Sequence, residues 1–243
     1  MKIIDVSNHN GTIDWEKVKA SGIEGVIIRA GYGKSIIQKD LAFERNYAGA
    51  AEAGLHIGAY WYSYATNAVD AKKEAAVFLE VIKGKKFDLP LWLDIEDKCQ
   101  FNIGKGVCTD ITTTFLTDIE NAGYYAGVYS FDSFFSSNLE PWIRSRYAVW
   151  AARVENVLPK IAVEWGIHQY SWKGKVDGIK GDVDMNNCRK DYPGIIRKAG
   201  LNGYAKDPKF TVTANVSGID KDKAEQIAKA CGEMGMTVIK KEE

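Results

Sequence analysis

Short runs of apolar and β-branched residues recur along the chain, and segments of helical periodicity lie between many of them. Eight runs have the length of strands, at residues 2–6, 25–30, 56–62, 88–95, 124–129, 147–151, 166–170 and 181–185. Five segments have apolar residues at helical spacing, several with a capping Asp and a closing Gly, at residues 13–22, 40–54, 68–84, 110–123 and 132–145. This alternation of strand and helix predicts a parallel sheet.

The pattern changes after about residue 147, where the last three runs are separated by stretches too short or too polar for crossover helices. We therefore expect an α/β fold over residues 1–195, a TIM-like barrel with about eight strands and a reduced set of about five helices. One flank of strands would carry no helix. An ordinary eight-helix barrel and an open doubly wound sheet are the alternatives.

The last part of the chain has its own pattern. Residues 209–219 alternate like a strand, residues 220–235 form an amphipathic helical pattern that ends at Gly, and residues 236–241 form a second strand pattern. They predict a small βαβ-like appendage over residues 209–243, after a linker at residues 196–208. Such a unit is too small to be stable alone. We expect it to pack on the barrel, to pair with a copy of itself in a homo-oligomer, or to be the remnant of a longer attachment module.

The composition excludes several classes of function. With 46% hydrophobic residues among 243, the chain can bury the core of one large domain. Lys plus Arg number 32 and Asp plus Glu number 32, so the net charge of +0 gives no long-range attraction to nucleic acid or to an anionic membrane. No stretch approaches the roughly 18 apolar residues of a membrane span, and the start, MKIIDVSNHNG, lacks the apolar core of a secretory signal. We expect a soluble protein made without a signal peptide.

Cysteine and histidine spacing does not indicate a metal site. The four cysteines lie apart without a CxxC pair, which favours reduced thiols over disulfides. Cys99 and Cys108 flank a short loop and are the only pair worth testing for a disulfide. His9, His56 and His168 are not at metal-ligand spacing. We expect neither a metal nor a cofactor.

The stretch LPLWLDIEDKCQ, residues 89–100, places carboxylates directly after a buried strand. Side chains two apart on a strand share a face, so Asp94 and Glu96 point one way while Leu93 and Ile95 point into the opposite layer. Their Cβ atoms should lie roughly 6 to 7 Å apart. Two carboxyls held that close raise the pKa of at least one, which prepares it to act as a general acid near neutral pH. The alternative is a solvated strand end whose acids cap the next loop.

Other acids and many aromatic residues fall at the ends of predicted strands. Asp5 closes the run MKIID and Asp184 closes GDVD, and in a parallel barrel such ends meet on one face. Four acids gathered there suit a divalent metal or the oxocarbenium-like transition state of glycoside hydrolysis. The aromatic residues near these ends are Tyr60, Trp61, Tyr62, Trp92, Tyr129, Tyr170 and Trp172. Together they favour a glycan cleft, because flat aromatic faces suit sugar rings, whereas core packing is the alternative for each one singly, for Trp92 in particular.

Five blocks of the sequence resemble the ordered motifs of one enzyme family. The blocks are DVSNHNGTIDWEKVKASGIEGVIIRAGYG, GLHIGAYWYSYA, LPLWLDIED, GVYS and HQYSWKGKVDGIKGDVDMN, and they span about residues 3–187. In this order and spacing they resemble the family 25 glycoside hydrolases, lysozymes that are also called 1,4-β-N-acetylmuramidases. The resemblance implies a barrel with a reduced set of helices. It also implies hydrolysis of the β-1,4 bond between N-acetylmuramic acid and N-acetylglucosamine in bacterial peptidoglycan.

The resemblance also implies roles for the acids. The family's DxE motif falls on Asp94 and Glu96, its first-strand aspartate on Asp5 and its late VDxN aspartate on Asp184. Glu96 would be the general acid, Asp94 would assist the substrate's 2-acetamido group as it attacks the anomeric carbon, and the other two would tune charge and binding. A carboxyl separation of about 5 to 5.5 Å favours direct nucleophilic retention, and about 6.5 to 9.5 Å leaves room for an inverting water. These distances do not apply when the substrate's own acetamido group is the nucleophile, so they do not decide between retention and inversion here.

The residues expected to bind substrate depart from the family pattern at two places. Many members carry Tyr-His-Phe on the third strand where this chain has Tyr60, Trp61 and Tyr62, and many carry a lysine in the second-strand block where it has Arg29. We expect Arg29 to pair with Asp5 or another barrel acid, or else to contact a peptidoglycan carboxylate. The full set expected to bind substrate is Tyr60, Trp61, Tyr62, Arg29, Tyr129, Gln169 and Trp172.

Two other functions fit the same pattern. One is a chitinase-like N-acetylhexosaminidase, which also uses a DxE pair and a substrate acetamide, and the other is a glycan-binding barrel that has lost catalysis. The expected partner is the glycan strand of bacterial peptidoglycan, with no nucleic acid and no membrane. A missing signal peptide fits a phage endolysin that stays in the host bacterial cytoplasm until its release to the cell wall, and an extracellular enzyme is the alternative. The C-terminal segment would then bind the wall or mediate oligomerisation.

Overall fold

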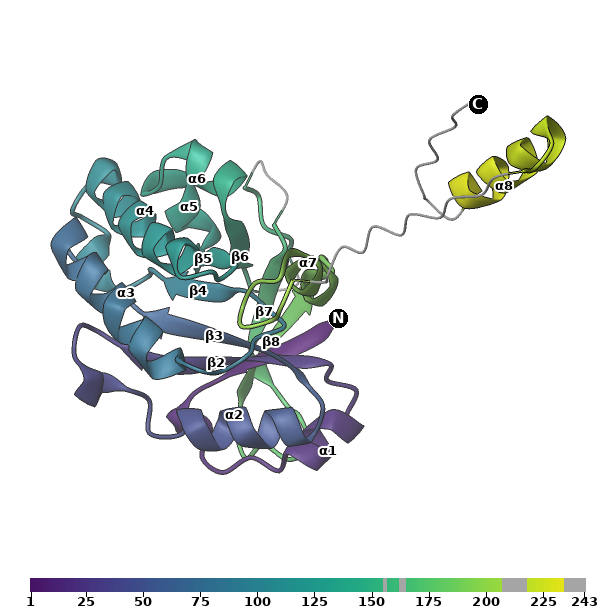
Figure 1. Ribbon diagram of the computed structural model, residues 1–243. Helices are drawn as coiled ribbons and strands as arrows, with labels where there is room; N and C mark the ends of the chain where they lie inside the picture. Colours follow the sequence, from purple (N-terminus) through teal and green to yellow (C-terminus); the bar gives the residue numbers. More distant parts are fainter. Residues whose placement is uncertain (155–156, 162–164, 207–217, 234–243) are drawn as a thin grey trace. The chain divides into compact units, whose positions relative to one another are not determined.

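The chain forms two compact units, Met1–Asp207 and Pro208–Glu243. The computed structural model describes residues 1–154, 157–161, 165–206 and 218–233. In the first unit eight strands close into a barrel in sequence order (Figure 1). They are β1 (Lys2–Val6), β2 (Gly25–Tyr32), β3 (His56–Tyr62), β4 (Leu91–Asp94), β5 (Ala126–Phe131), β6 (Ala148–Ala152), β7 (Ile167–Gly174) and β8 (Val183–Cys188). The predicted fold class, a TIM-like α/β barrel, is confirmed.

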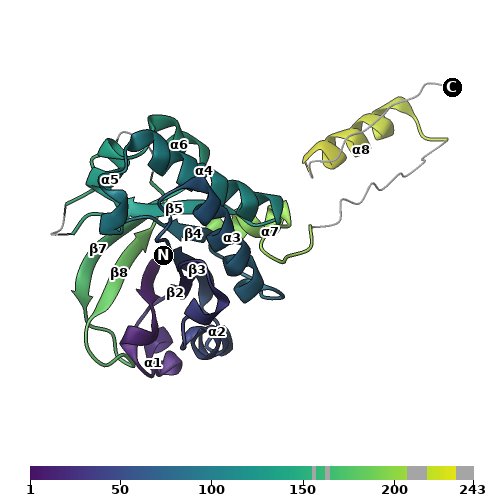
Figure 2. The same ribbon diagram turned by 90° about the vertical axis from the view of Figure 1, so that its left-hand side faces the viewer.

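The helices of the barrel unit outnumber the five that we predicted. They are α1 (Trp15–Ala20), α2 (Phe43–Glu52), α3 (Ala68–Ile82), α4 (Lys105–Asn121), α5 (Asp132–Ser137), α6 (Pro141–Arg146) and α7 (Tyr192–Ala199), with short 3-10 turns η1 (Asn8–Asn10), η2 (Ile36–Gln38) and η3 (Lys98–Gln100). The helix predicted at 132–145 is divided in two at Pro141. Proline has no N–H to donate to the preceding turn, and it keeps the residue before it, Glu140, in an extended conformation with a ψ angle of 141°. Among the described residues, no helix packs over the outer face of β7 and β8, which is the bare flank that we expected (Figure 2).

The last strand runs against the direction that the pattern predicted. Neighbouring strands from β1 to β7 pair in parallel, whereas β8 is antiparallel to both β7 and β1. The cause is the connection at residues 175–182, which is too short for the crossover that a parallel strand needs. The beginning of β8, rather than its end, therefore lies beside the carboxyl ends of the other strands. Asp184 reaches the face that we expected, but from a strand of opposite direction.

Side chains along the strands alternate between two buried layers. Leu93 and Ile95 lie in the layer between barrel and helices, whereas Trp92 lies in the barrel interior, as the alternation predicts. Tyr192 of α7 also belongs to the interior layer, with ring centroids 6.1 Å from Trp92 and 5.8 Å from Tyr125. This packing fills the part of the barrel interior that lies between the acids and α7.

Residues 196–206, which we predicted as part of a linker, belong to the barrel unit. Asn202 is fully buried there, and its side-chain amide donates to the carbonyl of Leu89 at 2.9 Å. Its Oδ1 accepts from the Tyr125 N–H at 2.6 Å, and its carbonyl accepts from the Phe87 N–H at 3.1 Å. These bonds join the segments that precede β4 and β5, so the barrel unit extends beyond the boundary that we predicted.

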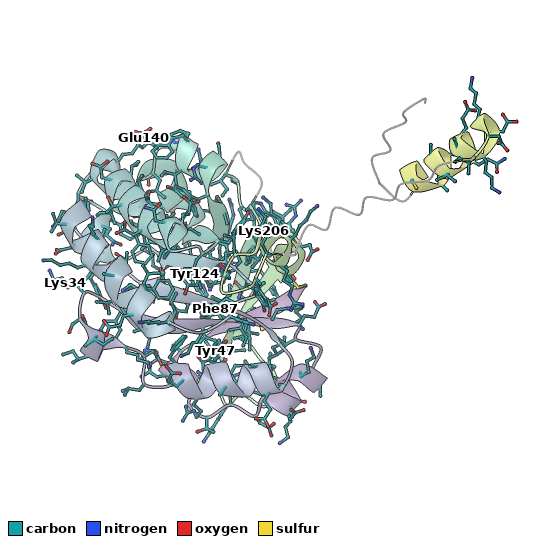
Figure 3. All side chains as sticks on the ribbon, viewed as in Figure 1. Lys34, Tyr47, Phe87, Tyr124, Glu140 and Lys206 are labelled. Carbon is teal, nitrogen blue, oxygen red and sulfur yellow. The ribbon has the colours of Figure 1, made fainter. Side chains whose placement is uncertain are left out.

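The outer core also ties α2 to the segment before β4. The ring of Tyr47 lies 5.6 Å from that of Phe87, and both are labelled side by side in Figure 3. The Tyr47 hydroxyl donates to the carbonyl of Lys86 at 3.0 Å. The segment before β4 is therefore bonded both to α2, through Tyr47, and to Asn202.

The two cysteines that flank the predicted loop do not form a disulfide. All four cysteines are unpaired, and Cys108 is buried. The thiol of Cys108 lies 3.2 Å from the carbonyl of Gln100, and that of Cys99 lies 3.8 Å from the carbonyl of Tyr64. The thiols therefore act as weak donors to loop carbonyls rather than as a cross-link.

In the second unit the described residues contain one helix, α8 (Lys221–Glu233), where the pattern predicted it. The strands predicted at 209–219 and 236–241 lie outside the described residues, apart from residues 218 and 219. Across the described parts of both units, no helix is long and apolar enough to cross a membrane.

Candidate active site

A cavity of about 350 Å³ opens at the carboxyl ends of the parallel strands. All eight strands contribute residues to its walls, so residues distant in sequence face one space. They are Asp5, Val6, Ser7, His9, Asn10, Arg29, Tyr60, Tyr62, Asp94, Glu96, Tyr129, Trp150, Gln169, Asp182 and Asp184. The lining is dominated by carboxyl, hydroxyl and amide groups, which suits a ligand rich in hydroxyls.

The four acids predicted from the strand ends all line this cavity. Asp5 lies directly opposite Asp184 in the antiparallel pair of β1 and β8. Asp94 is level with Tyr62 on one side and with Tyr129 on the other. Glu96, two residues after Asp94, lines the same cavity, as the period of a strand requires.

The closeness and burial of these acids raise their pKa values. Burial raises the pKa of Glu96 to about 7, with the charges of Asp184 and Asp97 adding to the rise and the nearby Tyr129 hydroxyl opposing it. Burial likewise raises the pKa of Asp184 to about 6. The pKa of Asp94 lies well above its usual range because of burial and the charge of Glu96. The site therefore holds protonated carboxyls close to neutral pH.

Asp5 is held by a chain of side-chain hydrogen bonds. Its Oδ2 accepts from the amide of Gln169 at 3.0 Å and from the amide of Asn186 at 2.8 Å. The Trp150 N–H donates to Asn186 Oδ1 at 2.8 Å, and the Tyr129 hydroxyl donates to Gln169 Oε1 at 2.8 Å. Since an indole is only a donor, Trp150 fixes the Asn186 amide with its NH₂ group toward Asp5. Even so, burial and the charge of Asp184 keep the pKa of Asp5 well above its usual range.

Glu96 and Asp94 differ from Asp5 in having an unsatisfied oxygen each. Within the described part of the chain, Glu96 Oε2 and Asp94 Oδ1 are shielded from solvent and have no hydrogen-bond partner. Buried polar atoms usually have partners, so these two oxygens are the candidates for accepting a hydrogen bond from a ligand in the cavity. The two oxygens belong to the DxE pair.

The other predicted binding residues divide into two groups. Tyr60, Tyr62, Tyr129, Gln169 and Arg29 line the cavity.

Trp61 and Trp172 do not line the cavity. Trp61 alternates with its neighbours on β3 and so points outward, where its ring packs on Phe78 at 5.6 Å and its N–H donates to the Gly33 carbonyl at 2.9 Å. Trp172 is 44% exposed and donates to Gln169 Oε1 at 2.8 Å. Trp61 is therefore a core residue, and Trp172 touches the site only through Gln169.

Arg29 pairs with an acid, but not with one of the four in the cavity. Its Nε donates to Asp40 at 2.8 Å, and its guanidinium also donates to Asn8. Asp40 has a fully buried side chain, and that of Arg29 is 15% exposed, so the pair is largely shielded from solvent. The guanidinium lies 5.9 Å from the ring centre of Tyr32. Arg29 thus joins the cavity wall to a neighbouring aromatic surface.

Sequence reasoning missed Trp150 and Asn186. Trp150 lines the cavity, and Asn186 supports Asp5. Asn186 is two residues after Asp184 on β8, so the rule that paired Asp94 with Glu96 would have found it. Trp150 sits in an apolar strand, where nothing distinguishes a cavity-lining indole from a core one.

A second cavity, of about 320 Å³, shares residues with the first. It is lined by Asn8, His9, Arg29, Tyr32, Tyr62 and Tyr64. The Tyr32 and Tyr64 rings meet edge to face at 6.1 Å, and the Tyr62 and Tyr64 rings lie 5.1 Å apart. With Tyr64 47% exposed, this aromatic surface is open to a ligand. Because the two cavities share His9, Arg29 and Tyr62, they adjoin each other and together form one groove.

Comparisons with known proteins agree with this geometry. The model of glycosyl hydrolases family 25 matches residues 4–179. The chain is 31% identical over 193 residues to the autolytic lysozyme of Clostridium acetobutylicum, an alignment that covers 76% of this chain and 55% of that protein. It therefore spans about half the length of that relative.

Two solved structures have the same fold. The CTP1L endolysin has 25% identity and a TM-score of 0.71, covering 100% of this chain and 83% of that one. The modular autolysin LytC from Streptococcus pneumoniae, solved in complex with a synthetic peptidoglycan ligand, has 30% identity and a TM-score of 0.68, covering 76% of this chain and 46% of that one. The matched region contains most of β1, all of β2 to β7 and three of the four acids, Asp5, Asp94 and Glu96, whereas β8 with Asp184 lies outside it. The chain belongs to glycosyl hydrolases family 25.

Proposed function

We propose that this protein is a lysozyme that hydrolyses the β-1,4 bond between N-acetylmuramic acid and N-acetylglucosamine in bacterial peptidoglycan. The supporting observations are its family, relatives named as an autolytic lysozyme and an endolysin, and a similar autolysin solved with a peptidoglycan ligand. The observation that carries the proposal is Glu96, a half-buried carboxyl at the cavity wall with a pKa of about 7 and one shielded oxygen that has no partner among the described residues.

Glu96 is the general acid. A group with a pKa near neutrality is protonated in a large fraction of molecules and still gives its proton up readily. As the bond between the anomeric carbon and the glycosidic oxygen breaks, the Glu96 proton moves to that oxygen. The carboxylate that remains then takes a proton from the water that completes hydrolysis.

Asp94 assists the substrate's 2-acetamido group. Its Oδ1 has no partner within the described residues, so it can accept the acetamido N–H. This contact directs the acetamido carbonyl oxygen to the anomeric carbon and stabilises the positive charge that develops on the group. Asp184, with a pKa of about 6, is largely ionised at neutral pH and adds negative potential that stabilises the oxocarbenium-like transition state, and its charge is in turn adjusted by Asp5 opposite it.

The tyrosines bind the glycan strand on either side of the reacting bond. Tyr62 lines both cavities, and Tyr32 and Tyr64 extend the aromatic surface away from the acids. Sugar rings present C–H groups on one face, which pack on flat aromatic rings. The groove therefore suits a polymer better than a single sugar.

The test is mass spectrometry of the fragments released from purified bacterial peptidoglycan, with chitin oligomers as a second substrate. We expect fragments with muramic acid at the reducing end and little cleavage of chitin oligomers. Glucosamine at the reducing end, or preferred cleavage of chitin oligomers, would indicate a chitinase-like N-acetylhexosaminidase. Binding to peptidoglycan without any release of fragments would indicate a glycan-binding barrel.

A further inference from the structure

Glu74 is a buried carboxyl that the proposed mechanism does not use. It lies on α3, is 1% exposed and lines neither cavity. Its Oε2 accepts from the Ser63 hydroxyl at 2.6 Å, and its Oε1 accepts from the Tyr64 N–H at 2.9 Å. One carboxyl thus binds two successive residues of the segment that follows β3.

Gln100 holds the same segment from the other side. Its amide donates to the carbonyl of Ser63 at 3.2 Å and to that of Ala65 at 3.1 Å. Its Oε1 accepts from the Asp97 N–H at 3.1 Å. Both side chains are buried, so residues 63–65 are held between α3 and η3 by bonds that are largely shielded from solvent.

This segment connects the two cavities to the catalytic strand. Tyr62 and Tyr64, which flank Ser63, line the second cavity, and Tyr62 lines the first as well. The Ser63 N–H donates to the Asp94 carbonyl at 2.9 Å, and the Tyr62 hydroxyl donates to Asp97 at 3.1 Å. A shift of the segment would move the tyrosine face relative to the acids.

We propose that Glu74 is a positioning residue, which holds residues 63–65 so that the tyrosines of the second cavity are aligned to bind the glycan strand. The role of the tyrosines rests on the proposed function, whereas the restraint on the segment does not. An apolar side chain at position 74 would leave the buried Ser63 hydroxyl and the partly buried Tyr64 N–H without their acceptor, which is costlier than losing a solvated hydrogen bond.

Glutamine is a matched replacement for this carboxyl. Burial raises the pKa of Glu74 to about 7, so the group readily holds a proton near neutrality. Glutamine has the same shape without charge, and its Oε1 can still accept from the Tyr64 N–H. Methionine has a similar volume but lacks strong acceptors. The pair Glu74→Gln and Glu74→Met therefore separates volume from hydrogen bonding.

The test compares KM and kcat on soluble glycan strands for the wild type and the two variants. Loss of both acceptors in Glu74→Met should raise KM by about 5- to 10-fold, the equivalent of roughly 1 to 1.4 kcal/mol, while kcat changes by less than about 2-fold. Glu74→Gln should recover most of the wild-type KM. The control is Val81→Ala, which removes a buried apolar group from the same helix and should lower the melting temperature without changing KM.

Amide hydrogen exchange gives a readout that does not require turnover. Exchange at residues 63–65 should be faster in Glu74→Met than in Val81→Ala. If Glu74→Met does not fold, Ser63→Ala takes its place, because it removes the hydroxyl that donates to Glu74. This variant should also raise KM and speed amide exchange at residues 63–65. Equal exchange and equal KM in these variants and in Val81→Ala would overturn the proposal. If amide exchange at residues 63–65 is faster in Glu74→Met but the wild-type protein releases no fragments from peptidoglycan, the proposed function is overturned and the restraint by Glu74 is not.

Discussion

At the scale of the residue, the chemistry of the site depends on how many protons its carboxyls share. Asp5, Asp94, Glu96 and Asp184 line one cavity, and burial raises the pKa of each. They differ in their hydrogen bonds, because two amides donate to Asp5, whereas an oxygen of Asp94 and one of Glu96 have no partner in the described chain. The surroundings thus give these acids different roles. Asp5 is held in place by two amides, whereas Asp94 and Glu96 each keep an oxygen that can bind substrate.

Raised pKa values predict that stability falls as pH rises. Folded Glu96, with a pKa of about 7, binds more protons between about pH 4 and pH 7 than the unfolded chain, whose glutamates titrate near 4.3. Its contribution is fully present below that unfolded value and is lost as pH rises through 7. Glu96→Gln should therefore be more stable than wild type at pH 8, by on the order of 2 kcal/mol, and equally stable near pH 4. Urea unfolding at the two pH values measures this, and an equal difference at both would contradict it.

The residues that the sequence identified best are those whose chemistry is unusual for their place. Carboxyls behind a buried strand, as at Asp94 and Glu96, have little reason to be there unless they act. Aromatic residues give no such signal, because an indole suits both a core and a sugar site. Trp61 was therefore wrongly expected at the cavity, and Trp150 was missed.

At the scale of the element, the period of a strand identifies its faces but not its direction. Alternation correctly placed Leu93 and Ile95 in the outer layer. It could not show that β8 runs antiparallel, because GDVDMN has the same alternation in either direction. Only the short connection at residues 175–182 carries that information.

The two faces of β3 predict opposite effects of conservative substitutions. Trp61→Phe removes a buried hydrogen bond to the Gly33 carbonyl and part of the outer core, so it should cost about 1 to 3 kcal/mol of unfolding free energy and leave KM within about 2-fold. Tyr62→Phe removes the bond to Asp97 at the cavity wall, so it should raise KM with a smaller loss of stability. Thermal unfolding and kinetics on the same glycan compare them. The reverse ranking would contradict the assignment of faces.

At the scale of the whole molecule, the barrel unit ends in an ordered segment that looks like a linker in the sequence. Gly200 and Asn202 have positive φ angles of 67° and 56°, and both residue types are common in loops. In the structure Gly200 ends α7 and Asn202 holds the segments before β4 and β5. Composition alone does not distinguish a flexible connection from an ordered one of this kind.

Two truncations test where the barrel unit ends. A chain that stops at Asp207 keeps Asn202 and its bonds and should melt within about 2 °C of the full chain. A chain that stops at Ala199 loses the four hydrogen bonds of Asn202 and should melt at least about 5 °C lower. Equal melting temperatures of the two truncations would place the boundary of the barrel unit near residue 195, as we predicted from the sequence.

Light scattering on the first truncation and on the full chain tests whether the C-terminal segment mediates self-association.

The most direct test of the proposed mechanism is the rate at which wild type and Glu96→Gln release muramic acid reducing ends from purified peptidoglycan, with Glu80→Gln on the exposed face of α3 as control. The account predicts a loss on the order of 10²- to 10⁴-fold for Glu96→Gln at an unchanged or higher melting temperature, and a wild-type rate for the control. A Glu96→Gln rate above about a tenth of wild type would show that another group delivers the proton.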